Sequence, residues 1–123
     1  MLAVAYTDGS YKEFPVIGGV YSGAAVLMND VTESSVLLSK ADNLPEYLPY
    51  RNIAGEITAV MMVCQHCLTN YKMKQGDTLE IYHDYVGLDF WVRPKGSEGH
   101  WAAKTPLSQM YRDYMNNNVK RVF

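Results

Sequence analysis

The first third of the chain alternates short runs of apolar residues with turn signals, which is typical of an antiparallel meander. The apolar run Leu2–Tyr6 ends at Thr7-Asp8-Gly9-Ser10, and Asp-Gly is a strong turn signal. Two further runs, Val16–Met28 and Ser34–Leu38, are rich in small and β-branched residues. We therefore predict three antiparallel strands, the first of which ends at Asp8.

The rest of the chain alternates between helical and strand-like periods. Apolar residues recur at helical spacing from Asn52 to Tyr71, with Asn52 as the predicted N-cap. Alternating residues over Thr78–His83 predict a fourth strand. The remaining predicted segments are a loop over Asp42–Pro49, a short helix over Val86–Trp91, a polar loop over Arg93–Thr105, a helix over Leu107–Met115 and a final strand over Val119–Phe123.

These elements predict an α/β fold in a single domain that spans residues 1–123. A length of 123 residues suits one domain. A helical crossover between two strands of one sheet makes them parallel. We therefore expect a mixed five-stranded sheet, with three antiparallel strands followed by strands parallel to the first, flanked by helices.

Charge and composition narrow the function classes. The net charge is −2, so the chain has no overall basic surface for nucleic acid. Many basic residues gather in the second half of the chain: Lys72, Lys74, Arg93, Lys95, Lys104, Lys120 and Arg121. No apolar stretch approaches the roughly 20 residues of a membrane span, and the N-terminus lacks the basic region of a signal peptide. We therefore predict no membrane partner and a cytoplasmic location.

Three acids stand at positions where the predicted fold would gather them. Asp8 ends the first predicted strand, Asp84 ends the fourth, and Glu56 lies in the first turns of the long helix. Ligands of open α/β sheets collect at the carboxyl ends of the strands. Taken singly, Asp8 suits a turn, Glu56 suits the N-terminal end of a helix, and Asp84 suits the cap of the following short helix. Taken together they predict a metal site, because clustered carboxylates repel one another unless a cation neutralises them.

Oxygen ligands of this kind favour magnesium or manganese. Two such ions can hold the attacking and leaving oxygens of a phosphodiester. The predicted chemistry is therefore hydrolysis by water, with no nucleophilic side chain.

Four segments resemble the motifs of type 1 ribonuclease H, in the family's order and over the whole chain. They are Tyr6–Ser10, the glycine-rich Gly18–Ala25, Asn52–Ala59 with its asparagine four residues before the glutamate, and Ile81–Leu88 followed by Trp91. Trp101–Lys104 and Tyr111 resemble the segment that follows in some bacterial members. The resemblance implies an RNase H-like fold and an enzyme that cuts the RNA strand of an RNA–DNA hybrid.

The resemblance also assigns the site. It makes the three acids the catalytic carboxylates, with Mg²⁺ or Mn²⁺ as cofactor. It implies that Gly9 and Ser10 approach the RNA strand with backbone and hydroxyl groups. It implies that Asn52 contacts the minor groove of the hybrid, where the 2′-hydroxyl distinguishes RNA from DNA.

The chain departs from the family at its C-terminal end. The family has a fourth acid on a C-terminal helix and a histidine in the loop after the last strand. This chain stops at Phe123, within the predicted final strand, and Asp113 lies in the helix before it. We therefore expect weak metal binding, slow cleavage, and either a homodimer through the exposed C-terminal edge or a poorly soluble monomer.

Other interpretations remain open. The same fold could serve as a catalytically impaired nucleic-acid-binding domain. It could also carry a different metal nuclease or a transposase-like enzyme, which the Asn52–Glu56 motif disfavours. The C-x-x-C pair Cys64 and Cys67 is predicted to be buried and apolar in character, because it lies on the apolar face of the long helix. The ten tyrosines are expected mainly to pack at sheet and helix edges.

Overall fold

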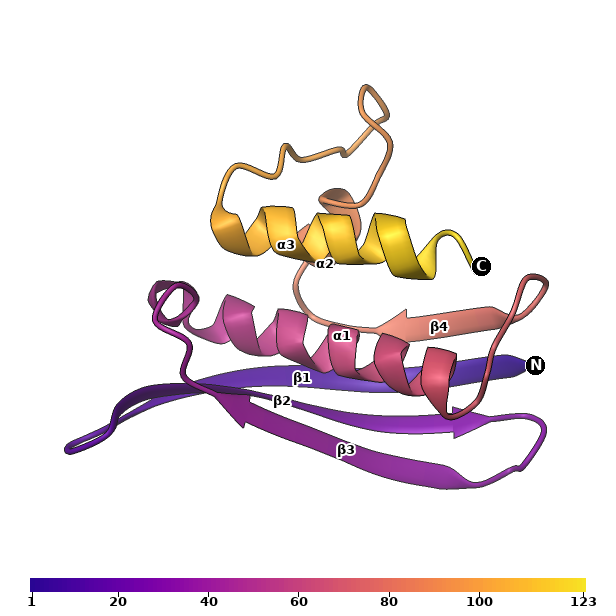
Figure 1. Ribbon diagram of the computed structural model, residues 1–123, viewed down its shortest axis with the longest axis horizontal. Helices are drawn as coiled ribbons and strands as arrows, with labels where there is room; N and C mark the ends of the chain where they lie inside the picture. The colour runs from indigo at the N-terminus through magenta and orange to yellow at the C-terminus, as the bar shows by residue number, and fades with distance from the viewer.

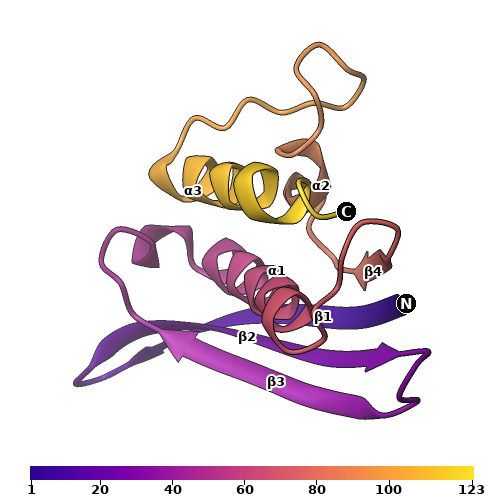
Figure 2. The same cartoon turned by 45° about the vertical axis from the view of Figure 1, so that its right-hand side comes forward.

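The computed structural model describes all 123 residues. The helices lie on one face of a single sheet (Figure 1). The long helix α1 lies directly on the sheet, and α3 lies on the far side of α1 (Figures 1 and 2). The other face of the sheet carries no helix. In chain order the elements are β1 (Leu2–Phe14), β2 (Gly18–Asn29), β3 (Ser35–Asp42), η1 (Leu48–Tyr50), α1 (Asn52–Thr69), β4 (Thr78–Tyr82), α2 (Gly87–Phe90), α3 (Pro106–Tyr114) and η2 (Met115–Val119).

The sheet topology confirms the α/β class and the mixed pairing. The strand order is β3-β2-β1-β4. β1 and β2 pair antiparallel, as do β2 and β3. β4 follows α1 and pairs parallel to β1, from Leu2 opposite Thr78 to Tyr6 opposite Tyr82. The crossover through α1 therefore returns the chain to the edge of β1.

The prediction of a fifth strand over Val119–Phe123 is wrong, because the sheet has four strands. The chain instead continues from α3 into the π-helical turn η2. Lys120 N–H donates to the Met115 carbonyl at 2.8 Å, and Phe123 N–H donates to the Val119 carbonyl at 3.0 Å. This helical course buries Val119, only 7% exposed, while its neighbours keep local hydrogen-bond partners. The predicted dimer through a C-terminal edge strand loses its basis, since β3 and β4 are the edges.

The prediction that β1 ends at Asp8 is also wrong. β1 runs on to Phe14, and Asp8 pairs with Ala24 in the interior of the hairpin. The hairpin turns at residues 15–17 instead. Pairing with β2 satisfies the backbone groups of β1 along its length, which outweighs the local turn tendency of Asp-Gly. The parallel pairing with β4, however, stops at Tyr6, so Asp8 still lies just beyond it.

Helix α1 forms close to where its apolar period predicts. Its first residue is Asn52, so the predicted N-cap role is wrong; Arg51 occupies the cap position, and no side chain caps the helix. Cys64 and Cys67 are both fully buried and form no disulfide, which confirms their prediction as small buried apolar residues. Burial raises the pKa of both thiols to about 12, which makes them poor nucleophiles.

Two clusters of buried side chains form the core. One packs α1 against the C-terminal helices and includes Ile57, Val60, Leu107 and Tyr111. The other packs α1 against the sheet and includes Ala3, Ala5, Leu27, Val63 and Cys67. None of the helices is both long and apolar enough to cross a membrane.

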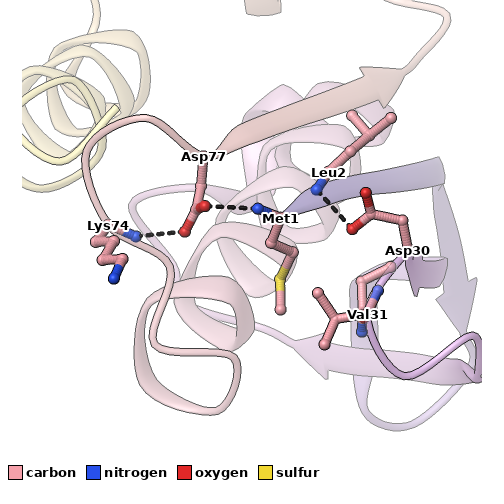
Figure 3. Close-up of polar contacts among 7 residues, drawn as sticks. Met1, Leu2, Asp30, Val31, Lys74 and Asp77 are labelled. Atoms are coloured by element: carbon pink, nitrogen blue, oxygen red, sulfur yellow. Dashed lines mark hydrogen bonds and ion pairs between the residues drawn. The ribbon is translucent and has the colours of Figure 1, made fainter.

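The amino end of the chain is tied into the sheet by polar contacts (Figure 3). The α-ammonium group of Met1 donates to Asp77 Oδ1 at 2.7 Å, and Lys74 N–H donates to Asp77 Oδ2 at 2.9 Å. Leu2 N–H donates to Asp30 Oδ1 at 2.8 Å. The hydrogen bond to the ammonium group lowers the pKa of Asp77, and the same bond raises the pKa of the ammonium group. Asp77 therefore joins the start of β1 to the start of β4.

Replacing Asp77 by asparagine should lower the free energy of unfolding by a small but measurable amount, because the pair is partly open to solvent. The stabilisation by Asp77 is present above the ordinary carboxyl pKa of 3.8 and is lost as pH falls through its lowered folded value. The stabilisation by the ammonium group is lost as pH rises from its ordinary pKa of 8.0 through its raised value. Urea unfolding at several pH values measures this loss. The free energy of unfolding of Asp77→Asn should differ most from that of the parent chain between pH 3.8 and pH 8.0. Asp113→Asn, on α3, is the control, and an equal loss in both variants would contradict the prediction.

Candidate active site

Glu56 is the only charged residue that the fold buries, with 8% of its surface exposed. It lies near the start of α1, on the side that faces β1. Its Oε1 accepts a hydrogen bond from Gly9 N–H at 3.1 Å. Its Oε2 is also buried but has no hydrogen-bond partner. A buried carboxylate oxygen without a partner is costly for stability, so it is a candidate for a functional role.

Glycines allow α1 to approach the sheet closely enough to place Glu56. A Cβ atom on Gly9 would meet backbone atoms of Gly55 and Glu56 at less than 3.0 Å. A Cβ atom on Gly55 would in turn meet backbone atoms of Ser10 and Ser22 at less than 3.0 Å. The backbones of helix and strand are therefore in direct contact, which only glycine permits. This contact fixes the distance between Glu56 and β1.

Asp8 joins Glu56 at one backbone group. Asp8 is exposed, and its Oδ1 accepts a hydrogen bond from Gly9 N–H at 2.9 Å. Gly9 N–H thus lies between a carboxylate oxygen of Asp8 and a carboxylate oxygen of Glu56. The structure therefore brings together two of the three predicted acids, from a strand and from the helix that crosses it.

Asp84 approaches the same place from β4. Thr7 Oγ1 donates to the Tyr82 carbonyl at 3.2 Å, which holds the end of β4 beside β1. Asp8 and Asp84 each follow the last residue pair of this parallel ladder, Tyr6 and Tyr82, by two positions. Asp84 is exposed and has no hydrogen bond to either of the other acids. It therefore lies at the rim of the group formed by Asp8 and Glu56.

The electrostatics link the three acids. Burial raises the pKa of Glu56, and the negative charges of Asp8 and Asp84 raise it further. The hydrogen bond from Gly9 opposes this rise by stabilising the ionised form. Asp8 and Asp84 are thus both close enough to Glu56 to oppose its ionisation. However, no group of three or more His, Cys, Asp or Glu side chains has the arrangement of a metal-binding set.

The donor chemistry nevertheless fits a hard divalent cation. All available ligand atoms are carboxylate oxygens, which magnesium and manganese prefer. The unpaired Oε2 of Glu56 is available as a ligand, and a cation would relieve the repulsion from Asp8 and Asp84. The three residues therefore suit such an ion by chemistry, although their side chains do not form a complete ligand set.

The predicted substrate-binding residues lie around Glu56 and stay accessible. Ser10 is exposed, and its hydroxyl lies 2.6 Å from the hydroxyl of Ser22 on the neighbouring strand. Asn52 is exposed at the first position of α1. Gly9 is half-buried, and its N–H is already engaged by the two acids. Asn52 therefore offers a free amide at this edge and Ser10 an exposed hydroxyl that is bonded to Ser22, while Gly9 acts mainly through its lack of a side chain.

Arg51 is a functional candidate that the sequence analysis did not identify. It is exposed, directly precedes Asn52, and places its guanidinium over the Tyr11 ring at 5.5 Å. Its φ of 50° is uncommon for a residue with a side chain. It forms no ion pair, so it is available to a phosphate. The only signal in the sequence is its place just before the Asn52–Glu56 motif.

A scan against models of known protein families finds no match to this chain, and a search of curated proteins finds no significant match either.

Proposed function

We propose that the chain is a metal-dependent endoribonuclease of the type 1 ribonuclease H kind, which cleaves the RNA strand of an RNA–DNA hybrid. The observation that carries the proposal is the buried Glu56, held by Gly9 through one oxygen and unpaired at the other. A purely structural carboxylate in this position would have partners for both oxygens. Its neighbours Asp8 and Asp84 place further negative charge near this buried carboxylate, which destabilises its ionised form and is unfavourable in a purely structural role.

The topology supports the RNase H-like part of this proposal. Three antiparallel strands are followed by a helix and then by a strand parallel to the first. This order places the start of α1 over β1 and ends β4 beside it (Figure 1). It agrees with the order of the four motifs along the chain. The sheet itself establishes only an α/β fold with mixed pairing.

The carboxylates would hold Mg²⁺ or Mn²⁺, and such an ion would activate water and stabilise negative charge on the scissile phosphate. The protein's contribution is to fix the orientation of the carboxylates in advance. Glu56 is fixed by the rigid contact between α1 and β1 and by the N–H of Gly9. Asp8 is fixed by the same N–H. Asp84 is the least constrained of the three.

The groups beside the acids suit a hybrid substrate. Ser10 and Asn52 offer an exposed hydroxyl and an exposed amide, which can recognise 2′-hydroxyls in a shallow minor groove. Arg51 offers a guanidinium that can pair with a phosphate. Further basic residues lie in the loop between α2 and α3, which projects from the molecule in Figure 2: Arg93, Lys95 and Lys104.

A nucleic-acid-binding domain without turnover is the second candidate. It is favoured by the lack of a complete metal-binding set among the side chains. The two candidates share hybrid binding and differ in cleavage, so one assay separates them.

The test uses a labelled RNA–DNA hybrid and a DNA duplex of the same sequence. We expect the hybrid to bind more tightly than the DNA duplex, with an affinity that falls as salt rises because phosphate contacts release counterions. We expect slow cleavage of the RNA strand, faster in manganese than in magnesium, because magnesium demands near-ideal octahedral geometry. Hybrid binding without cleavage in either metal would favour the second candidate. Equal affinity for the two duplexes would contradict both.

A further inference from the structure

Two tyrosines form an exposed stacked pair on the helix-free face of the sheet. The rings of Tyr6 and Tyr82 lie 5.0 Å apart between centroids, with 13° between their planes. The two residues are opposite each other in the parallel ladder, and they are 54% and 52% exposed. Their neighbours Ala5 and Thr7 are buried on the other face, beneath α1. Since β4 is an edge strand, the pair lies at the edge of the sheet, where the tyrosines were expected to pack.

A shallow hollow of about 470 Å³ adjoins Tyr6 on this face. Since side chains alternate along a strand, the residues that open into it from this face are Tyr6, Asp8, Ala24, Val26, Leu37 and Ser39. Tyr82 does not line it, so the hollow lies over β2 and β3, on the other side of Tyr6. Leu37 is 80% exposed. The hollow therefore lies between Tyr6 on β1 and Leu37 on β3, and the small side chain of Ala24 on β2 forms its floor.

The hollow shares Asp8 with the candidate active site, which Glu56 reaches from the other face of the sheet. Asp8 lines it and also shares Gly9 N–H with Glu56. A group bound in the hollow would therefore lie beside Asp8. Asp8 is the only charged residue that lines the hollow, and its carboxylate would repel a phosphate, so the hollow suits an uncharged, flat group.

We propose that this hollow binds an unpaired nucleobase of the nucleic-acid strand held at Asp8, with the base stacked on Tyr6. This inference rests on the proposed function, because it takes the neighbouring phosphate to lie at the acids. Stacking on an aromatic ring suits every base, since each has a flat π face. A base within the hybrid is already stacked and paired, so the hollow selects a single-stranded nucleotide that flanks the hybrid. The ring of Tyr82 stacks on the ring of Tyr6 on the side away from the hollow and restricts its orientation.

The experiment measures binding of a hybrid whose RNA strand carries a short unpaired overhang with one 2-aminopurine, in buffer with Ca²⁺, a hard cation that carboxylate oxygens also bind. Stacking on Tyr6 should quench the 2-aminopurine fluorescence. The variants are Tyr6→Leu, which keeps an apolar side chain but removes the ring, and Ala24→Leu, which fills the hollow beside Tyr6 and keeps both tyrosine rings. Phe14→Leu is the matched control, because Phe14 is an exposed aromatic residue on the same strand and lies outside the hollow.

We expect both variants to weaken binding of the overhang hybrid by about fivefold or more, as the usual contribution of a stacked base implies. They should leave binding of the blunt hybrid unchanged, as should the control. Equal affinities of the parent chain and both variants for the overhang would overturn the proposal. A second outcome would also overturn it: the parent chain is a dimer, and Tyr6→Leu makes it monomeric without changing the fluorescence quench. A second copy of the chain would then cover this face. Cleavage in magnesium or manganese is scored separately, so quenching without cleavage would count against the nuclease and not against the base site.

Discussion

Replacing Glu56 by glutamine is expected to lower cleavage of the hybrid at least about 100-fold, because metal stabilisation of the charged transition state contributes several kcal/mol. Glutamine keeps an oxygen that can accept the N–H of Gly9, so the local structure should survive. It removes the negative charge that a cation requires. The rate of RNA cleavage under saturating hybrid is the measurement.

The same substitution should raise the free energy of unfolding at neutral pH. Burial and the charges of Asp8 and Asp84 raise the pKa of Glu56, so ionised Glu56 destabilises the folded chain. The sign follows from proton binding: the folded state holds this proton more tightly than the unfolded state does. Stability is therefore highest below the ordinary pKa of 4.5 and falls as pH rises through the raised folded value. Glu56→Gln should remove this fall.

Urea unfolding of both chains at several pH values tests the stability effect. Glu80→Gln, at an exposed position on β4, is the matched control and should change neither activity nor the pH profile. A variant that cleaves at the parent rate would show that Glu56 is not part of the catalytic site. A variant that loses both activity and stability would indicate that the charge of Glu56 supports the fold instead of opposing it.

Replacing Gly9 by alanine is expected to destabilise the fold by about 3 kcal/mol or more, at or above the upper end of typical overpacking penalties. The new Cβ atom would meet the backbone of α1 at Gly55 and Glu56, which cannot move aside as a flexible side chain can. The helix would have to lift from β1. Cleavage should be lost even under conditions where the variant stays folded, because Glu56 would move with the helix.

Gly19→Ala is the control for this prediction. The atoms nearest to a Cβ on Gly19 would be the ring and hydroxyl of Tyr11, at the flexible end of a side chain. We therefore expect a much smaller loss of stability for Gly19→Ala in urea unfolding. Similar losses in the two variants would mean that the close contact between α1 and β1 is not what Gly9 provides.

The local pattern of residues was sufficient to predict most helices and strands. The helical period after Asn52 predicted α1, and the alternation over Thr78–His83 predicted β4, because each element exposes one face and buries the other. The positions of the three candidate acids followed from the same pattern and from the resemblance to a known family. Asp8 was nevertheless predicted to end the first strand, since the turn tendency of Asp-Gly is local and pairing with β2 is not.

The sequence by itself therefore determined the class of fold, the order of its elements and the identity of the candidate acids. Only the tertiary structure decided that α1 contacts the backbone of β1 at Gly9, that Glu56 is buried with one oxygen unpaired, and that Asp84 stands apart from the other two acids. It also decided that Val119 continues a helix instead of starting a strand. These features depend on contacts between segments far apart in the chain, and burial and pairing there outweigh local preference.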